Sequence, residues 1–244
     1  MTIPNRRIRV GPLLLAGALL SAAAAEAGWL IVDHRGDQTL LSRGRLKIAA
    51  RQADGHAMVL DLGRARLWVA DRGRRLYWDG TVEEYCQAIR AAMPASEETL
   101  ATPPTSERGG APPRVAVEPT AETETIATLP TRKYRVLVDG ALYEELWLTS
   151  ETSLVRELEL GRAPETFGRM FACMSGGGQR VEATAEYRQL FARGWPLKVV
   201  YHAEGGRALR ALVTRVEERE IPEGDFTPPP GFRTAPLAEL FGRR

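Results

Sequence analysis

The chain of 244 residues carries 33 lysines and arginines against 31 aspartates and glutamates, a formal net charge of +2. This near balance excludes the strongly basic surface by which many proteins bind nucleic acids. Only two cysteines are present, so a disulfide scaffold is excluded and a hydrophobic core must hold the fold. The length is sufficient for one substantial core or two small ones.

The first 27 residues have the three-part layout of a secretory signal peptide. A basic segment is followed by an uncharged run rich in leucine and alanine, residues 10–25, and then by the small-x-small sequence Ala25-Glu26-Ala27. The run falls short of the roughly 20 residues that a membrane-spanning helix needs. We therefore predict cleavage after Ala27 and a soluble periplasmic protein, residues 28–244, that does not span the membrane.

Residues 28–93 have the pattern of a strand meander followed by one helix. Short apolar segments alternate with glycine-containing turns, which is typical of antiparallel strands. These segments are 29–32, 40–50, 58–62, 67–70 and 75–78. Thr81 and Glu84 then have capping-box spacing, and apolar residues recur at helical spacing until Pro94 ends the run.

Residues 94–125 differ in composition from the rest of the chain. Proline, serine, threonine, alanine and glutamate dominate, and aromatic residues are absent. Such a segment buries too little apolar surface to offset the entropy lost on ordering. We predict a flexible insertion within a single domain.

Residues 133–244 restart the β pattern. Asp139-Gly140 is a strong hairpin signal between strands 133–138 and 142–149. Further strands are predicted at 154–160, 197–201 and 208–216, helices at 163–174 and around 183–192, and a proline-rich extended tail from Ile221.

Several strands carry large apolar side chains on both faces, which a sheet exposed to water on one face would not show. The strand 142–149 is an example, with Tyr143 and Trp147 beside three leucines. Both faces must therefore be covered, or the sheet must enclose something apolar. The fold class predicted is α+β, mostly antiparallel: a curved sheet or unclosed half-barrel with two or three helices packed against it or plugging it.

The order of elements resembles that of bacterial periplasmic proteins related to the lipoprotein carriers, which have the LolA-like fold. The resemblance rests on the helix after Tyr77-Trp78-Asp79-Gly80, the strand around Trp147, the block Tyr187 to Leu197, and the tail Ile221-Pro222 to Gly231-Phe232. It implies an unclosed barrel with an apolar interior and a helical plug, spanning residues 28–244. The long insertion at 94–125 departs from the carriers.

The sequence offers little chemistry for catalysis or metal binding. His34, His56 and His202 lie in separate segments without metal-ligand spacing, and no nucleophile elbow or phosphate loop is present. Adjacent acids such as Glu144-Glu145 are interpreted as solvated strand edges. We predict no catalytic residue, no metal and no cofactor, and therefore no enzyme.

Two functions fit this pattern. The first is binding or carrying an apolar ligand, a lipid or an acylated lipoprotein, in the concavity of the sheet, with Trp147, Leu146 and Trp68 as candidate lining residues. The alternative is a structural or assembly partner in the cell envelope, with a filled core and no small-molecule ligand. An enzyme would instead require a cleft with converging polar groups.

Cys86 and Cys173 are candidates for a disulfide bridge. Exported thiols meet an oxidising compartment, and both residues fall in predicted helices that the proposed fold places in one layer over the sheet. Two unpaired core cysteines are the alternative, because a free cysteine packs well as a small apolar side chain.

Overall fold

A computed structural model describes residues 26–92, 113–157, 163–174, 181–203 and 206–241. Residues 1–25 of the predicted signal peptide and residues 93–112 of the predicted insertion lie outside the described residues. None of the described helices is long and apolar enough to cross a membrane.

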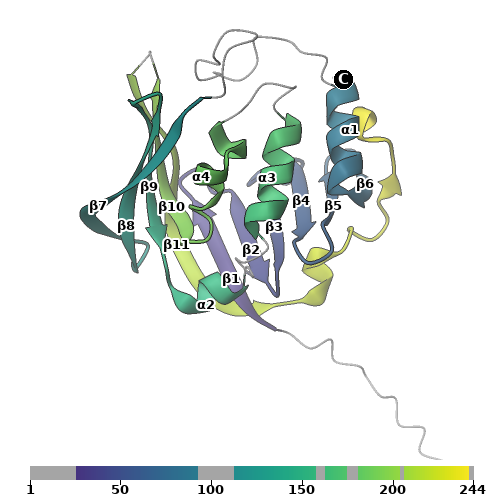
Figure 1. The fold of residues 1–244 in the computed structure, drawn as a ribbon. Helices are drawn as coiled ribbons and strands as arrows, with labels where there is room; N and C mark the ends of the chain where they lie inside the picture. Colours follow the sequence, from purple (N-terminus) through teal and green to yellow (C-terminus); the bar gives the residue numbers. More distant parts are fainter. Residues whose placement is uncertain (1–25, 93–112, 158–162, 175–180, 204–205, 242–244) are drawn as a thin grey trace, which may run out of the picture.

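Twelve strands of the described chain form one sheet, in the order β12-β6-β5-β4-β3-β2-β1-β11-β10-β9-β8-β7. Neighbours are antiparallel, except that the short β12 runs parallel to β6. The sheet is curved and unclosed (Figure 1), with β12 and β7 as its edge strands, which confirms the predicted fold class. The strands are β1 (Glu26–Asp33), β2 (Gln38–Ser42), β3 (Arg45–Ala49), β4 (His56–Asp61), β5 (Arg66–Asp71), β6 (Leu76–Thr81), β7 (Val115–Ile126), β8 (Leu129–Val138), β9 (Ala141–Thr149), β10 (Trp195–Ala203), β11 (Gly206–Ile221) and β12 (Arg233–Thr234).

Three helices stand over the concave face of the sheet: α1, α3 and α4 (Figure 1). The sequence predicted helices at these places. Two further short helices, α2 and α5, were not predicted. The helices are α1 (Val82–Ala92), α2 (Thr152–Glu157), α3 (Ala163–Met174), α4 (Ala185–Arg188) and α5 (Leu237–Phe241), and two 3-10 turns are η1 (Val181–Ala183) and η2 (Glu223–Phe226).

Three hairpins use the same tight turn, and the sequence predicted only the one at Asp139-Gly140. Ala127 and Thr128, with φ angles of 47° and 75°, join β7 to β8 in this way. Asp139 and Gly140 have φ angles of 50° and 84°, as a two-residue turn with both φ values positive requires. Arg43 and Gly44, with φ angles of 48° and 70°, make the equivalent turn between β2 and β3. The sequence predicts a single run at 40–50 here, because the turn at Arg43-Gly44 lacks an Asn-Gly or Asp-Gly pair.

The predicted capping box at the start of α1 is confirmed. The backbone N–H of Thr81 donates to Glu84 Oε2 at 2.7 Å, and the N–H of Glu84 donates to Thr81 Oγ1 at 3.1 Å. Two N–H groups that the helix cannot pair internally are thereby satisfied. The cap fixes α1 directly after β6.

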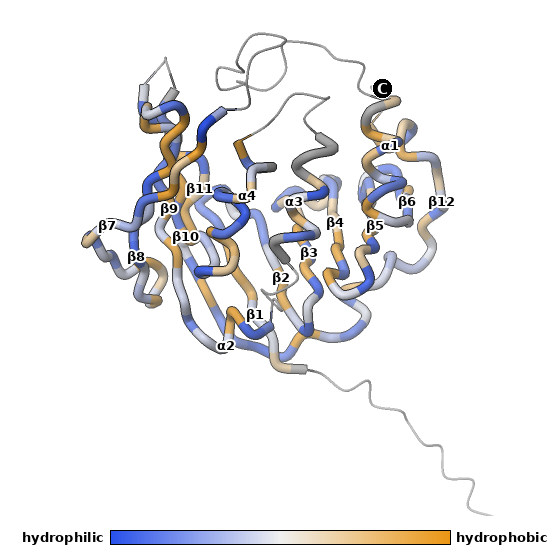
Figure 2. The backbone as a smooth tube through the Cα atoms, viewed as in Figure 1, coloured by the Kyte–Doolittle hydropathy of each residue, from blue (hydrophilic) through white to orange (hydrophobic). Residues whose placement is uncertain are grey.

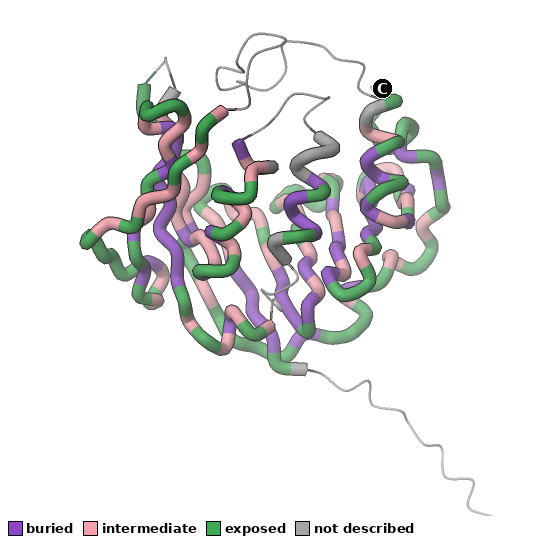
Figure 3. Tube along the Cα trace, in the orientation of Figure 1, coloured by how far each residue is buried: buried purple, intermediate pink, exposed green. Residues whose placement is uncertain are grey.

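Both faces of the first half of the sheet are buried. Alternate residues of β4 and β5 belong to different clusters: Leu60 and Leu67 pack in the large core under the helices, and Val59 and Trp68 pack in a second cluster. Figures 2 and 3 show apolar, buried stretches along these strands. The expected two-sided burial is therefore correct, and different elements cover the two faces.

The C-terminal segment covers the face opposite the helices. Phe226 of η2 packs in the second cluster, and its carbonyl accepts a hydrogen bond from Trp68 Nε1 at 3.0 Å. Glu223 accepts from Arg45 at 2.7 Å, and Lys47 Nζ lies 3.0 Å from Asp225. The predicted extended tail, Ile221 to Phe232, is wrong in part, because residues 223–226 form the turn η2. Beyond this tail, α5 returns Leu237 and Leu240 to the main core.

The predicted strand 154–160 is wrong where the structure describes it. Residues 152–157 form α2, with the Val155 N–H donating to the Glu151 carbonyl at 2.9 Å. Leu154 is fully buried in the main core. A short apolar run does not distinguish a strand from one turn of helix by periodicity alone.

The predicted insertion is too long at its C-terminal end. Residues 115–126 form β7, which pairs with β8 along its length, with a register shift between Pro119 and Thr123. Since β7 is an edge strand, charged residues and a proline at an irregularity are tolerated there. The composition that suggested a linker belongs instead to a strand exposed at the edge of the sheet.

Helices α1 and α3 pack against each other at Cys86. Arg169 of α3 pairs with Glu83 of α1 at 2.9 Å, and Cys86 Sγ lies 4.0 Å from the Arg169 carbonyl oxygen. Cys86 is disulfide-bonded. The chain has one other cysteine, Cys173, four residues after Arg169 and thus one helical turn along α3. The side chain of Cys173 lies outside the described residues, so its pairing with Cys86 stays a prediction.

We expect the protein purified without reductant to show no free thiols when denatured, and two after reduction. The bridge would join α1 to α3 across a long loop, which the chain-entropy model values at about 4–5 kcal/mol. Thiol titration measures the count, and non-reducing peptide mapping should recover the Cys86 and Cys173 peptides as one species. Two free thiols in the unreduced protein would refute the pairing.

Candidate functional site

A bulge in β9 turns two adjacent side chains toward the helices. The register of β8 against β9 shifts between Val136 and Leu137, which leaves Tyr143 as the extra residue. Tyr143 packs in the cluster that contains Tyr187 of α4, and the carboxyl of Glu144 meets the hydroxyl of the same Tyr187. Bulges of this kind re-aim side chains and are frequent beside functional sites.

Glu144 is a buried carboxyl group on this face. Its side chain is 1% exposed and accepts a hydrogen bond from the Tyr187 hydroxyl at 2.8 Å. Burial raises the pKa of Glu144 to about 8, and the nearby Glu182 carboxylate adds to the rise, while the Tyr187 hydrogen bond opposes it. The site can therefore hold a proton on a carboxyl group near neutral pH.

A second carboxylate and two tyrosines extend this cluster. Glu182 of η1 accepts hydrogen bonds from the Tyr143 hydroxyl at 3.1 Å and the Tyr201 hydroxyl at 3.3 Å. The rings of Tyr143 and Tyr201 meet edge to face, with centroids 5.3 Å apart, and Arg210 donates to the Tyr201 hydroxyl. Burial is the main cause that raises the pKa of both tyrosines, so they act as hydrogen-bond donors and not as bases.

A groove of about 560 Å³ lies further along β9 on the same face. Its walls come from β7, β8, the end of β9 and the segment after α4. The lining residues are Thr123, Glu124, Thr125, Pro130, Thr131, Arg132, Tyr134, Leu148, Ser150 and Arg193. The groove is therefore built from hydroxyl and guanidinium groups around a few apolar side chains.

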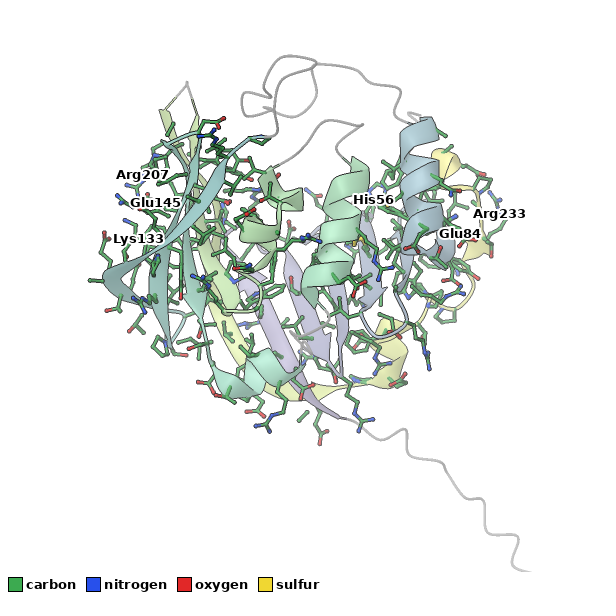
Figure 4. The ribbon with its side chains drawn as sticks, viewed as in Figure 1. His56, Glu84, Lys133, Glu145, Arg207 and Arg233 are labelled. Atoms are coloured by element: carbon green, nitrogen blue, oxygen red, sulfur yellow. The ribbon has the colours of Figure 1, made fainter. Side chains whose placement is uncertain are left out.

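The opposite face of β9 carries a separate ionic cluster around Glu145. This carboxylate lies 2.6 Å from Lys133 Nζ, 2.8 Å from His202 Nε2 and 3.6 Å from Arg207. Figure 4 shows Glu145, Lys133 and Arg207 gathered there, away from the helix layer. Burial alone would raise the pKa of Glu145, but the hydrogen bonds from Lys133 and His202 outweigh it and lower the pKa.

The interpretation of Glu144 and Glu145 as solvated strand edges is wrong. Both are buried, at 1% and 6% exposure, on opposite faces of β9. The sequence contained a usable signal, because a strand with large apolar residues on both faces leaves no solvated position for a carboxylate. Acids in such a strand must find buried partners.

The three predicted lining residues do not meet. Leu146 packs in the cluster under α4, Trp147 belongs to the main core, and Trp68 lies in the cluster under the C-terminal segment. Trp147 is opposite Lys133 and Lys198 in register, and their Nζ atoms stand 5.1 Å and 4.2 Å from its ring centroid. The three side chains therefore do not line a common cavity.

The described part of the chain offers no candidate metal-binding site. No group of three or more His, Cys, Asp or Glu side chains that could hold a metal ion occurs among the described residues. His56 stacks on Phe241 and His202 binds Glu145, which gives both a structural environment.

Comparisons with known proteins give only distant structural similarity. No family model and no curated protein matches the chain. Among solved structures, the chain is similar to the crystal structure of MucB, at 13% identity and a TM-score of 0.30. The match covers 86% of this chain and only 60% of the MucB chain. A likeness this distant bears on neither the ligand nor the partner of this chain, and the resemblance to the lipoprotein carriers stays a prediction.

The raised pKa of Glu144 predicts a specific pH dependence of stability. The folded state binds this proton more tightly than the unfolded state, whose carboxyl titrates near the ordinary value of 4.5. The free energy of unfolding should therefore fall as pH rises from about 4.5 to about 8, because the unfolded state is then the stronger acid. Glu144→Gln should remove most of this decline, measured by urea unfolding at about pH 5 and about pH 8.5.

Glu145→Gln is the matched control for this measurement. Its carboxylate has a lowered pKa in the folded state, so its contribution to stability is present above the ordinary carboxyl pKa and is lost only in more acidic solution. The control should lower stability at both pH values. Parallel pH profiles of Glu144→Gln and the wild type would contradict the assignment.

Proposed function

We propose that this chain is an exported, non-enzymatic protein of the cell envelope that binds an apolar or acylated ligand on the concave face of its sheet. The ligand class is a lipid or an acylated lipoprotein, and no cofactor takes part. Export through cleavage after Ala27 and a periplasmic location belong to the same proposal. The proposal is supported by apolar side chains that continue from the main core to the protein surface.

An exposed apolar patch at the edge of the helix layer carries the proposal. Ile48 follows Leu46 by two residues on β3 and thus shares its helix-side face, yet Ile48 is 40% exposed. Met58 lies opposite Ile48 in register and packs against the main core. Phe241, also 40% exposed, stacks on His56 two residues before Met58, with ring centroids 5.6 Å apart. The patch therefore continues the main core outward, as the entrance for an acyl chain would.

A packed interior favours the second candidate, an envelope assembly partner without a small-molecule ligand. The main core of the described residues consists of side chains exposed by 9% or less. Two cavities, of about 470 Å³ and 560 Å³, are lined largely by polar and charged residues such as Arg35, Asp37 and Arg51. An acyl ligand would have to displace part of this packing, whereas a protein partner could use the patch as it stands.

We expect a neutral monoacylglycerol to bind the purified protein at about 1 µM or more tightly, an affinity within reach of one buried acyl chain. Ile48→Asp should weaken binding by about tenfold, because a charge then replaces apolar contact area at the patch. Calorimetric titration measures both affinities. Because Ile48 is exposed, the variant should fold, and circular dichroism checks this.

Leu209→Asp is the matched control, since Leu209 is an exposed leucine, at 47%, on β11 and away from the patch. It adds the same charge and should leave the affinity unchanged. Absence of any acyl binding by the wild type would overturn the carrier function in favour of the assembly partner.

We expect the exported protein to begin at Gly28. The basic segment, the apolar run and the small residues before the cut predict this site. N-terminal sequencing of the protein from the periplasmic fraction measures it, and Ala27→Arg should block cleavage there. A mature N-terminus far from residue 28, or retention in the cytoplasm, would refute export by this signal.

A further inference from the structure

The groove on the concave side of β7–β9 places two arginines together. Arg132 and Tyr134 are two residues apart on β8 and share a face, and Arg132 pairs in register with Thr123 and Leu148. The guanidinium of Arg193 stands over the Tyr134 ring, 5.5 Å from its centroid. Both positive groups therefore line the same hollow from two different segments of the chain.

Neither arginine has an acidic partner within the described residues. Arg132 Nε donates to the Thr120 carbonyl at 3.0 Å, which uses one of five guanidinium donors. Glu124, the one acid of the groove lining, has its carboxylate 2.7 Å from Lys198 Nζ. Lys198 stands over Trp147 on the opposite face of the sheet. The Glu124 carboxylate therefore pairs with this lysine and not with the two arginines.

The other groups of the groove suit a small oxyanion. Thr123, Thr125 and Ser150 contribute hydroxyl groups from the exposed parts of β7 and the end of β9. Leu148 is buried and Pro130 lies beside it, so the groove also has an apolar component. Guanidinium forks with hydroxyl donors are the usual partners of phosphate and carboxylate groups.

We propose that this groove is an anion-binding site that takes a phosphate or carboxylate group, with Arg132 and Arg193 as its two binding cations. The anion comes either from a free oxyanion or from the headgroup of an acylated ligand. The site does not depend on the acyl-binding function proposed above, because its residues are distinct from the patch at Ile48.

Titration of the isotope-labelled protein with inorganic phosphate tests the site. Saturable shifts of the Arg132 and Arg193 side-chain N–H signals are expected, and raising the salt concentration should weaken binding. Arg132→Gln and Arg193→Gln should each weaken phosphate binding by about tenfold, the loss of one charge-assisted contact. Both residues are exposed, so the variants should fold.

Arg135→Gln is the matched control. Arg135 is an exposed arginine on β8, three residues from Arg132, and pairs with Glu118 at 3.0 Å. This variant removes the same charge from the opposite face and should change phosphate affinity by less than about twofold. An equal loss in Arg132→Gln and Arg135→Gln would show a general charge effect and overturn the site, as would a wild type that binds no phosphate.

A second titration with dodecyl phosphate below its micelle concentration distinguishes the two sources of the anion. An affinity at least about tenfold tighter than that of inorganic phosphate, lost in Arg193→Gln, identifies an acylated ligand. Equal affinities with the same arginine dependence identify a free oxyanion, and both results support the site. Binding of neutral monoacylglycerol without phosphate binding would overturn this site alone, and the reverse result would overturn the carrier function alone.

Discussion

The first half of the sheet buries both of its faces although the sheet does not close into a barrel, and most of the remaining structure follows from that constraint. Strands such as β5 place apolar side chains alternately under the helices and under the C-terminal segment. Neither cover is another sheet. The helix layer and the C-terminal segment are therefore required by the sequence of the strands themselves, since exposure of either face would leave large apolar side chains such as Trp68 in water.

The fold class could be predicted because its signals are local. The capping box at Thr81 and Glu84, the Asp139-Gly140 turn and the stripe of α3 each act over a few residues, and the structure contains all three. The misjudged segments depend on distant neighbours. Nothing within residues 115–126 reveals that β8 supplies their hydrogen bonds, and nothing near Leu154 reveals that the core accepts it as one turn of helix.

The candidate site was harder to predict from sequence, because it too depends on residues distant in the chain. A one-residue bulge decides that Tyr143 and Glu144 share a face, and only the register of β8 against β9 creates that bulge. Two consecutive glutamates then acquire opposite electrostatic behaviour. Tyrosines surround Glu144, whereas Lys133, His202 and Arg207 surround Glu145, so one carboxyl tends to keep its proton and its neighbour to lose it.

The pairing of β1 with β11 has a consequence for how the molecule acquires its structure. Residues 26–33 pair with residues 213–221, so a strand from each end of the chain meets in the middle of the sheet. The contact order is correspondingly high, and the entropy of closing so long a loop must be met before the contacts form. Neither half of the sheet can join the other while the chain is still emerging. The complete sheet therefore forms only after β11 has been made, and until then nothing pairs the first half of the sheet with the second.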